Sequence, residues 1–216
     1  AEPSQRLAMV RSFYGGKNSY DAYDHILCAT GVTLVSASVR GSYGFGKEFE
    51  ALNDKDLGGD EIVDLFYVAR WLEARTGLPP ERIGVYGRSH GGYATMRALT
   101  FPKESGRGER YPFGFGISDA GFSDIKTFHD ATNIPDWVVL ESGDPSVPEE
   151  LARMHERSAL RHVARLERPL LLTHGEKDWR VRVDESRSFA AAAKAAGKPV
   201  TYVEFDEQGH TLHCLA

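Results

Sequence analysis

Short apolar runs alternate along the chain with longer stretches in which apolar residues recur at helical spacing. Six runs predict β-strands, at residues 9–14, 32–39, 82–86, 113–117, 169–173 and 200–205. Several of these runs are almost entirely apolar, which is typical of strands buried on both faces of a sheet. Strands that alternate with helices predict an α/β fold, with a mostly parallel central sheet and helices on both faces.

The longer stretches predict four helices. Residues 60–75 carry apolar side chains at roughly helical spacing, and Asp60 is the expected N-cap. Helices are also expected at 91–99, 148–166 and 184–196, the last ending at Gly197. The charged, glycine-rich stretch 103–110 indicates a surface loop. No repeat or linker interrupts the pattern, so residues 1–216 are expected to form a single domain.

Charge and composition exclude several classes of partner. The net charge is −5, and no dense run of Lys and Arg is present, so no nucleic-acid partner is expected. No apolar run approaches the ~20 residues that span a bilayer, and no signal peptide is recognised, so no membrane association is expected. Cys28 and Cys214 are interpreted as two free thiols, which favours the cytoplasm without deciding the compartment. The oligomeric state, a homo-oligomer included, stays open.

The strongest local signal is Gly87-Arg-Ser89-His-Gly91, directly after one predicted strand and directly before a predicted helix. This is the context of a nucleophile elbow, in which a serine sits on a very sharp strand-to-helix turn. The residues two before and two after the serine must lack side chains, and Gly87 and Gly91 meet that need. Gly92 leaves further room for the helix to pack on the sheet. The sequence therefore predicts the α/β-hydrolase fold with Ser89 as nucleophile.

A serine hydroxyl needs a base to take its proton and an acid to orient that base. In this fold the chain order is serine, acid, histidine, with each partner in a loop after a later strand. Asp178 follows the strand at 169–173, and His210 follows the strand at 200–205. Glu176 and Asp184 are rival acids, but Asp184 suits the N-cap of the following helix better. His213 is the rival base.

The remaining histidines lie outside this pattern. His174 ends a strand and is expected to hydrogen-bond locally. His90 follows the nucleophile, and its backbone N–H is of more interest than its ring. The others are interpreted as surface or packing residues: His25, His129, His155 and His162.

Several segments, taken in order, resemble the catalytic domain of the prolyl oligopeptidase family. The likeness rests on residues 87–93, on His174-Gly-Glu-Lys-Asp-x-Arg-Val181 and on Gly209-His210. It extends to residues 14–16, 39–46 and 141–145. Each piece is weak alone, but the ordered set is specific, and it covers the chain from about residue 9 to residue 210.

The resemblance implies a role for each matching residue. Ser89, Asp178 and His210 match the family's catalytic triad. The Tyr14 hydroxyl and the His90 N–H match its oxyanion hole. Arg180 matches an arginine that in family members can bind a substrate carbonyl, and Val181 matches a wall of the pocket for the residue before the scissile bond. Phe122 and Phe128 are expected to add aromatic surface to that pocket.

The chain also departs from the family pattern. The family's amino-terminal β-propeller, which restricts access to small peptides, has no counterpart in these 216 residues. The chain is therefore expected to be a catalytic domain without its propeller, and size selection is in doubt. Some members carry Pro after the Tyr-Gly-Gly motif, where this chain has Lys17.

The expected activity is acyl transfer through an acyl-enzyme, without a metal or an organic cofactor. A serine peptidase that cleaves short peptides is the first hypothesis. An esterase that uses the same triad on small acyl esters is the second, since the fold does not choose between them. A non-catalytic binding module is the third.

Overall fold

A six-stranded parallel sheet organises the protein. The computed structural model describes residues 7–12, 29–101 and 113–211. Every neighbouring pair of strands in the sheet order β2-β1-β3-β4-β5-β6 is parallel, which confirms the expected α/β-hydrolase type of sheet. The strands are β1 (Ala8–Arg11), β2 (Thr33–Ser36), β3 (Ile83–Arg88), β4 (Phe115–Asp119), β5 (Leu170–Gly175) and β6 (Val200–Phe205). All six expected strands are present; β6 has the expected bounds, and the ends of the other five are shifted.

The helices differ more from expectation. The α-helices in the described residues are α2 (Lys47–Glu50), α3 (Asp60–Thr76), α4 (His90–Thr100), α5 (Ile125–Ala131), α6 (Pro135–Ser142), α7 (Pro148–Arg157) and α8 (Asp184–Ala195). Short 3-10 segments are η2 (Ala51–Asn53), η3 (Pro80–Arg82) and η5 (Ala159–Arg165). The sequence pattern did not predict α2, α5 or α6.

Three expectations about helix boundaries were wrong. Gly59, not Asp60, is the N-cap of α3, and the Asp60 N–H is satisfied by the Asp56 carboxylate at 2.9 Å. The N-cap of α8 is Val183 and not Asp184. The single helix expected over 148–166 is broken at Ser158, whose backbone is extended and whose hydroxyl accepts the Ile125 N–H. The expected loop at 103–110 lies outside the described residues.

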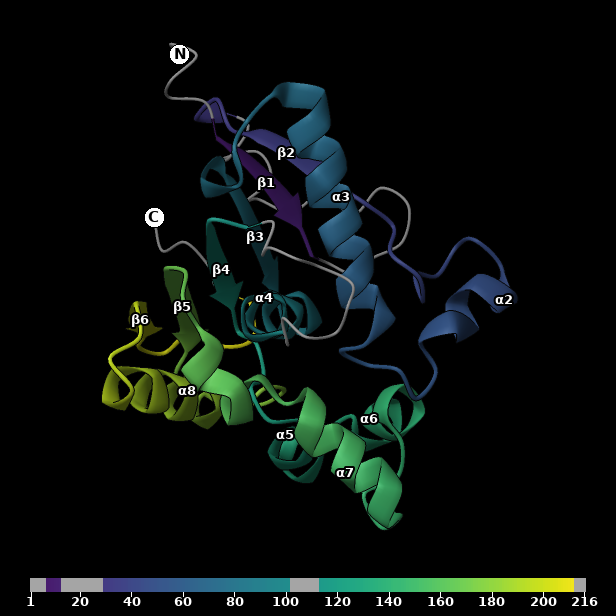
Figure 1. The fold of residues 1–216 in the computed structure, drawn as a ribbon. Coiled ribbons are helices and arrows are strands. Elements are labelled where there is room, and N and C mark those ends of the chain that lie inside the picture. Colours follow the sequence, from purple (N-terminus) through teal and green to yellow (C-terminus); the bar gives the residue numbers. More distant parts are fainter. Residues whose placement is uncertain (1–6, 13–28, 102–112, 212–216) are drawn as a thin grey trace.

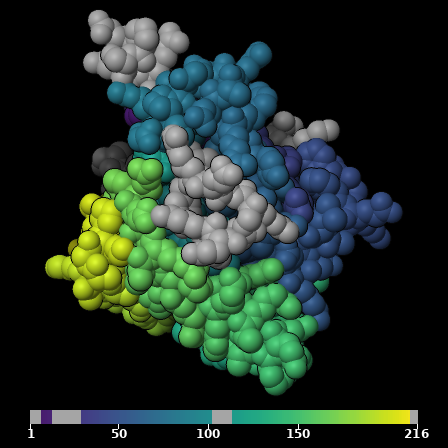
Figure 2. All heavy atoms as spheres, in the orientation of Figure 1, coloured from purple at the N-terminus to yellow at the C-terminus, as the bar shows by residue number. Residues whose placement is uncertain are grey.

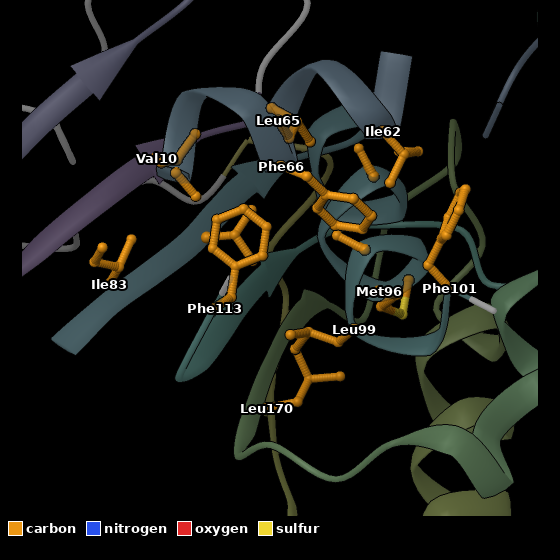
Figure 3. Close-up of a cluster of buried hydrophobic side chains, with 14 of the residues drawn as sticks. Val10, Ile62, Leu65, Phe66, Ile83, Met96, Leu99, Phe101, Phe113 and Leu170 are labelled. Carbon is orange, nitrogen blue, oxygen red and sulfur yellow. The ribbon is translucent and has the colours of Figure 1, made fainter. Parts of the chain in front are cut away.

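The main core lies between the sheet and the helices packed on it. Helices α3, α4 and α8 contact the strands, with α4 in contact with both β3 and β4. Figure 3 shows part of this core, with Val10, Phe66, Met96 and Leu170 among its buried side chains. Each of these side chains is at most 5% exposed. Burial of this apolar surface is the dominant favourable contribution to folding.

A second buried cluster lies under the helices that follow β4. Figure 1 shows α5, α6 and α7 beyond the arrowhead of β4, and Figure 2 shows this part as a lobe at the bottom of the molecule. The cluster consists of Leu57, Tyr93, Phe122, Ile125, Phe128, Val138, Met154 and Val181. It therefore joins α4, which follows the predicted nucleophile, to the α5–α7 helices. No helix in the described ranges is long and apolar enough to cross a bilayer.

Truncation of a core leucine should separate buried from exposed packing. Leu72 on α3 is 1% exposed, whereas Leu140 on α6 is 53% exposed. Leu72→Ala should lower the free energy of unfolding by about 2–5 kcal/mol, because it leaves a cavity. Leu140→Ala removes the same atoms and should cost well under half as much. Urea unfolding followed by circular dichroism measures both, and equal losses would contradict the assigned core.

Candidate active site

Ser89 occupies a strained turn between β3 and α4. Its φ of 58° and ψ of −119° are rare for a residue with a side chain. A Cβ at Gly87 would lie 2.5 Å from Ser12 Oγ and 2.8 Å from the carbonyl carbon of Gly91. A Cβ at Gly92 would lie 2.8 Å from the Asp119 carbonyl oxygen. The glycines are therefore required by close backbone approach, as the sequence pattern implies.

The structure brings the hydroxyl, the imidazole and the carboxylate of the predicted triad together. His210 Nε2 lies 3.0 Å from Ser89 Oγ, and His210 Nδ1 lies 2.7 Å from Asp178 Oδ2. Ser89 follows β3, Asp178 follows β5 and His210 follows β6. Because these strands are parallel, their carboxyl ends lie along one edge of the sheet. The three groups form a continuous chain of hydrogen bonds, in which the imidazole can take the serine proton and the carboxylate can stabilise the resulting imidazolium.

Asp178 is buried but well supplied with hydrogen-bond donors. Its Oδ1 accepts the backbone N–H groups of Arg180 and Val181, both at 2.9 Å, and His174 Nε2 lies 3.3 Å from its Oδ2. Burial alone would raise the pKa of Asp178. Hydrogen bonds from His174 and His210 outweigh burial and hold its pKa well below the ordinary value. Asp178 is therefore an anion at neutral pH and fixes His210 with the proton on Nδ1.

Each of the two rival acids lies near a cationic side chain. The Glu176 carboxylate lies 3.5 Å from Lys177 Nζ, and the exposed Asp184 carboxylate lies 3.5 Å from Arg187. The rival base, His213, lies outside the described residues, as does His25.

His174 has a larger part in the site than the sequence suggested. Its side chain is fully buried, with Nδ1 2.7 Å from Ser186 Oγ and Nε2 2.9 Å from the Val181 carbonyl oxygen. It thus ties the loop that carries Asp178 to the start of α8. Its position four residues before Asp178 at a strand end was the available signal, but the contact with Ser186 depends on the tertiary fold.

The buried carboxylate of Glu61 contacts the His90 ring. His90 Nε2 lies 3.2 Å from Glu61 Oε2, and Glu61 Oε1 accepts the Gly58 N–H at 2.8 Å. Burial disfavours the imidazolium, but the charge and hydrogen bond of Glu61 give His90 a net raised pKa. Nearby, Glu141 accepts a hydrogen bond from Asn53 at 2.6 Å. Burial raises the pKa of Glu141 to about 7.

The predicted substrate-binding residues occupy different environments. Arg180 is partly exposed, with its guanidinium 5.5 Å from the centre of the Trp179 ring. Val181 is fully buried directly after it. Phe122 and Phe128 are 1% and 3% exposed and stack on each other with ring centres 4.2 Å apart. The described residues thus enclose both rings, and their contribution to a pocket stays a prediction.

Of the two predicted oxyanion donors, only the His90 N–H lies among the described residues. The His90 N–H is the first of α4, beside Ser89, where the helix dipole favours negative charge. Tyr14, expected to supply the second donor, lies outside the described residues. No group of three or more potential metal ligands occurs in the parts of the chain that the structure describes.

The sequence of this chain is similar to those of known peptidases. The sequence model of the prolyl oligopeptidase family matches residues 18–214. Dipeptidyl aminopeptidase BIII of Pseudoxanthomonas mexicana is 31% identical over 207 residues, which cover 93% of this chain and 28% of the relative. The human acylamino-acid-releasing enzyme is 24% identical over 220 residues, which cover 96% of this chain and 29% of the relative.

Solved structures give the same picture. A puromycin-hydrolyzing peptidase of Mycobacterium tuberculosis superposes with a TM-score of 0.82 at 26% identity, covering 95% of this chain and 30% of that one. Acylaminoacyl peptidase of Pyrococcus horikoshii superposes with a TM-score of 0.82 at 27% identity, covering 97% and 34%. The chain thus spans roughly a third or less of the length of these proteins.

The raised pKa of Glu141 predicts a pH-dependent loss of stability. Native Glu141 keeps its proton up to pH about 7, whereas an unfolded glutamate releases it at lower pH. Stability should therefore fall as pH rises through this window, by a total on the order of 3 kcal/mol. Glu141→Gln, which retains an acceptor for Asn53, should not show this loss between pH 5 and 8.

The matched control is Glu149→Gln, which removes an exposed carboxylate on α7 and should follow the wild-type curve. Urea unfolding at several pH values provides the measurement. Parallel curves for wild type and Glu141→Gln would show that Glu141 is not held protonated by burial.

Proposed function

This chain belongs to the prolyl oligopeptidase family, and we propose that it is the catalytic domain of a serine peptidase that cleaves short peptides through an acyl-enzyme. The observation that carries the proposal is the chain of hydrogen bonds from Ser89 through His210 to Asp178. We propose that residues 1–216 act together as one such domain.

In the first step, Ser89 Oγ attacks the carbonyl carbon of the scissile bond. His210 Nε2, 3.0 Å from Ser89 Oγ, takes the proton of the hydroxyl. Asp178 carries the negative charge that stabilises the resulting imidazolium, and it keeps the Nδ1–H tautomer in place. The strained backbone at Ser89 keeps the oxygen at the end of the sheet, in front of the imidazole.

The developing oxyanion needs donors that are already in place. The His90 N–H at the start of α4 is the first donor in this proposal, and the Tyr14 hydroxyl is the second. Loss of one such donor typically costs about 3–4 kcal/mol of transition-state stabilisation. Arg180, fixed through its backbone N–H to Asp178, is proposed to hold a carbonyl of the substrate chain.

In the second half of the reaction, His210 gives its proton to the leaving amine. Water then attacks the acyl-enzyme, His210 again acts as base, and the carboxylic acid is released with Ser89 restored. Each proton is taken and returned by the same imidazole, so the cycle balances without another reagent.

Amide cleavage is favoured over ester cleavage by the relatives. Two of these relatives are named as peptidases, a dipeptidyl aminopeptidase and a puromycin-hydrolyzing peptidase, and a third is named as an acylamino-acid-releasing enzyme. This chain spans only part of the length of these proteins. We propose that a β-propeller outside these 216 residues selects substrates by size.

Replacement of the nucleophile should abolish turnover without unfolding the protein. Ser89→Ala removes the attacking oxygen, so hydrolysis of dipeptidyl and acylaminoacyl p-nitroanilides should fall by about 10⁴-fold or more. Circular dichroism should be unchanged. The same panel with p-nitrophenyl esters tests the bond type: Ser89-dependent amide turnover supports a peptidase, and turnover of esters alone supports an esterase.

Two histidines close in sequence give a matched test of the base. His210→Ala should lower kcat nearly as much as loss of the serine, because it removes the imidazole that accepts the serine proton. His213→Ala should change kcat by only a few-fold. The reverse result would reassign the base, and full activity in both variants would remove this imidazole from the mechanism.

A further inference from the structure

His174 is a fully buried imidazole behind the acid of the proposed triad, and it takes no part in the proton transfers. It is the second-last residue of β5. Its Nδ1 lies 2.7 Å from Ser186 Oγ, and its Nε2 lies 2.9 Å from the Val181 carbonyl oxygen. Nε2 also lies 3.3 Å from Asp178 Oδ2. The ring is therefore held in one orientation, and its partners identify which nitrogen carries a proton.

The partners of the ring place a proton on Nε2. A backbone carbonyl oxygen can only accept a hydrogen bond, so His174 Nε2 is the donor to Val181 in either protonation state of the ring. A serine hydroxyl can donate as well as accept, so in the neutral ring the Ser186 hydroxyl donates to Nδ1. The hydrogen bond at one ring nitrogen sets the proton on the other. Ser186 thus excludes the tautomer that would leave Nε2 without its proton.

The His174 Nε2–H supports the Asp178 carboxylate by two routes. Directly, Nε2 lies 3.3 Å from Oδ2, the oxygen that lies 2.7 Å from His210 Nδ1. Indirectly, it holds the carbonyl of Val181, whose N–H donates to Asp178 Oδ1 at 2.9 Å. Both carboxylate oxygens are therefore tied to groups that His174 contacts. A rotation of the carboxylate away from His210 would break these contacts.

Helix α8 connects this support to the packed sheet. Asp178 lies in the loop between β5 and α8, and Ser186 is a buried residue in the first turn of that helix. The hydrogen bond between His174 and Ser186 therefore joins the two ends of the loop. Helix α8 itself contacts both β5 and β6. The acid is thus held by the scaffold of the sheet and not by its loop alone.

We propose that His174, with its tautomer set by Ser186, is a positioning residue that keeps the Asp178 carboxylate aimed at His210. The inference rests on the proposed function of the triad. The contacts form one continuous series, from Ser89 through His210, Asp178 and His174 to Ser186. His174 touches no reacting atom and exchanges no proton in the reaction. It acts through the orientation of the acid, and hence of the general base.

The kinetic test compares His174→Leu, which fills the site without a donor, with His174→Gln, whose amide N–H can replace Nε2–H. In His174→Leu, kcat for the p-nitroanilides should fall by about 10–100-fold, because a misplaced acid no longer orients the base. KM should change by less than about threefold, since no substrate contact is lost. His174→Gln should recover most of the lost kcat. The control, Leu170→Ala, removes a buried side chain on the same strand and should lower stability while kcat stays unchanged.

A second readout needs no substrate and keeps this inference separate from the proposed function. The His210 Nδ1 proton, bonded to Asp178, gives a far-downfield proton NMR signal that is assigned by its absence in His210→Gln. The signal should persist in His174→Gln and should move upfield or disappear in His174→Leu. That pattern supports the inference even if wild type hydrolyses nothing, in which case the proposed function alone fails.

An unchanged signal in folded His174→Leu would overturn the role of His174, and so would an unchanged kcat in an active enzyme. If His174→Leu does not fold, Ser186→Ala tests the same claim, because it keeps the ring but no longer sets its tautomer. Ser186→Ala should then give a smaller loss of kcat and a smaller displacement of the signal. No change in either readout would overturn the inference.

Discussion

At the end of β3 the chain turns through Ser89 with a φ of 58°, and α4 begins at once against the sheet. This turn needs glycine at positions 87 and 92, because a Cβ at Gly87 would collide with the Gly91 backbone and a Cβ at Gly92 with the Asp119 carbonyl oxygen. The strain at one residue is held by the packing of α4 on β3 and β4, and by the Ser89 N–H bond to Asp119. The position of the hydroxyl, and hence its partnership with His210, depends on this constraint.

Two buried aspartates, Asp119 and Asp178, lie at the edge of the sheet that carries this hydroxyl. Asp178 is kept ionised by donors from His174, His210 and two backbone N–H groups, whereas Asp119 has a single donor from Thr173. Asp119 ends β4 and Asp178 follows the adjacent strand β5. On the other side of the nucleophile, Glu61 holds the His90 ring beside the proposed oxyanion donor. A buried charge persists where partners satisfy it, and the partners of Asp178 are themselves parts of the site.

Much of this arrangement follows from local sequence patterns. The apolar runs predict all six strands because strands buried on both faces leave a clear signal, and the glycines around Ser89 reveal the sharp turn. The order of serine, aspartate and histidine after successive strands then predicts the side chains that the structure brings together. The family resemblance seen in the motifs is confirmed by the match over residues 18–214.

What the sequence did not reveal depends on tertiary contacts. Helix α6 is short and packs against both α5 and α7, and its sequence lacks the amphipathic period that predicts a helix. The helix starts at Asp60 and Asp184 were misjudged by one residue because an acidic residue in the first turn looks like an N-cap. The contacts of His174 with Ser186 and of Asp119 with Thr173 depend on the tertiary fold, and no spacing along the chain encodes them. The expected donor Tyr14 lies outside the described residues, so its place in the site stays a prediction.

The central claim is that Ser89, at its strained turn, is the nucleophile activated by His210. Mass spectrometry of the protein after reaction with a fluorophosphonate, followed by peptide mapping, tests this claim most directly. The account predicts one adduct per chain, located on the peptide that contains Ser89 and formed at a rate that falls sharply in His210→Ala. An adduct on a different residue, or equal labelling of Ser89 without the imidazole, would contradict it.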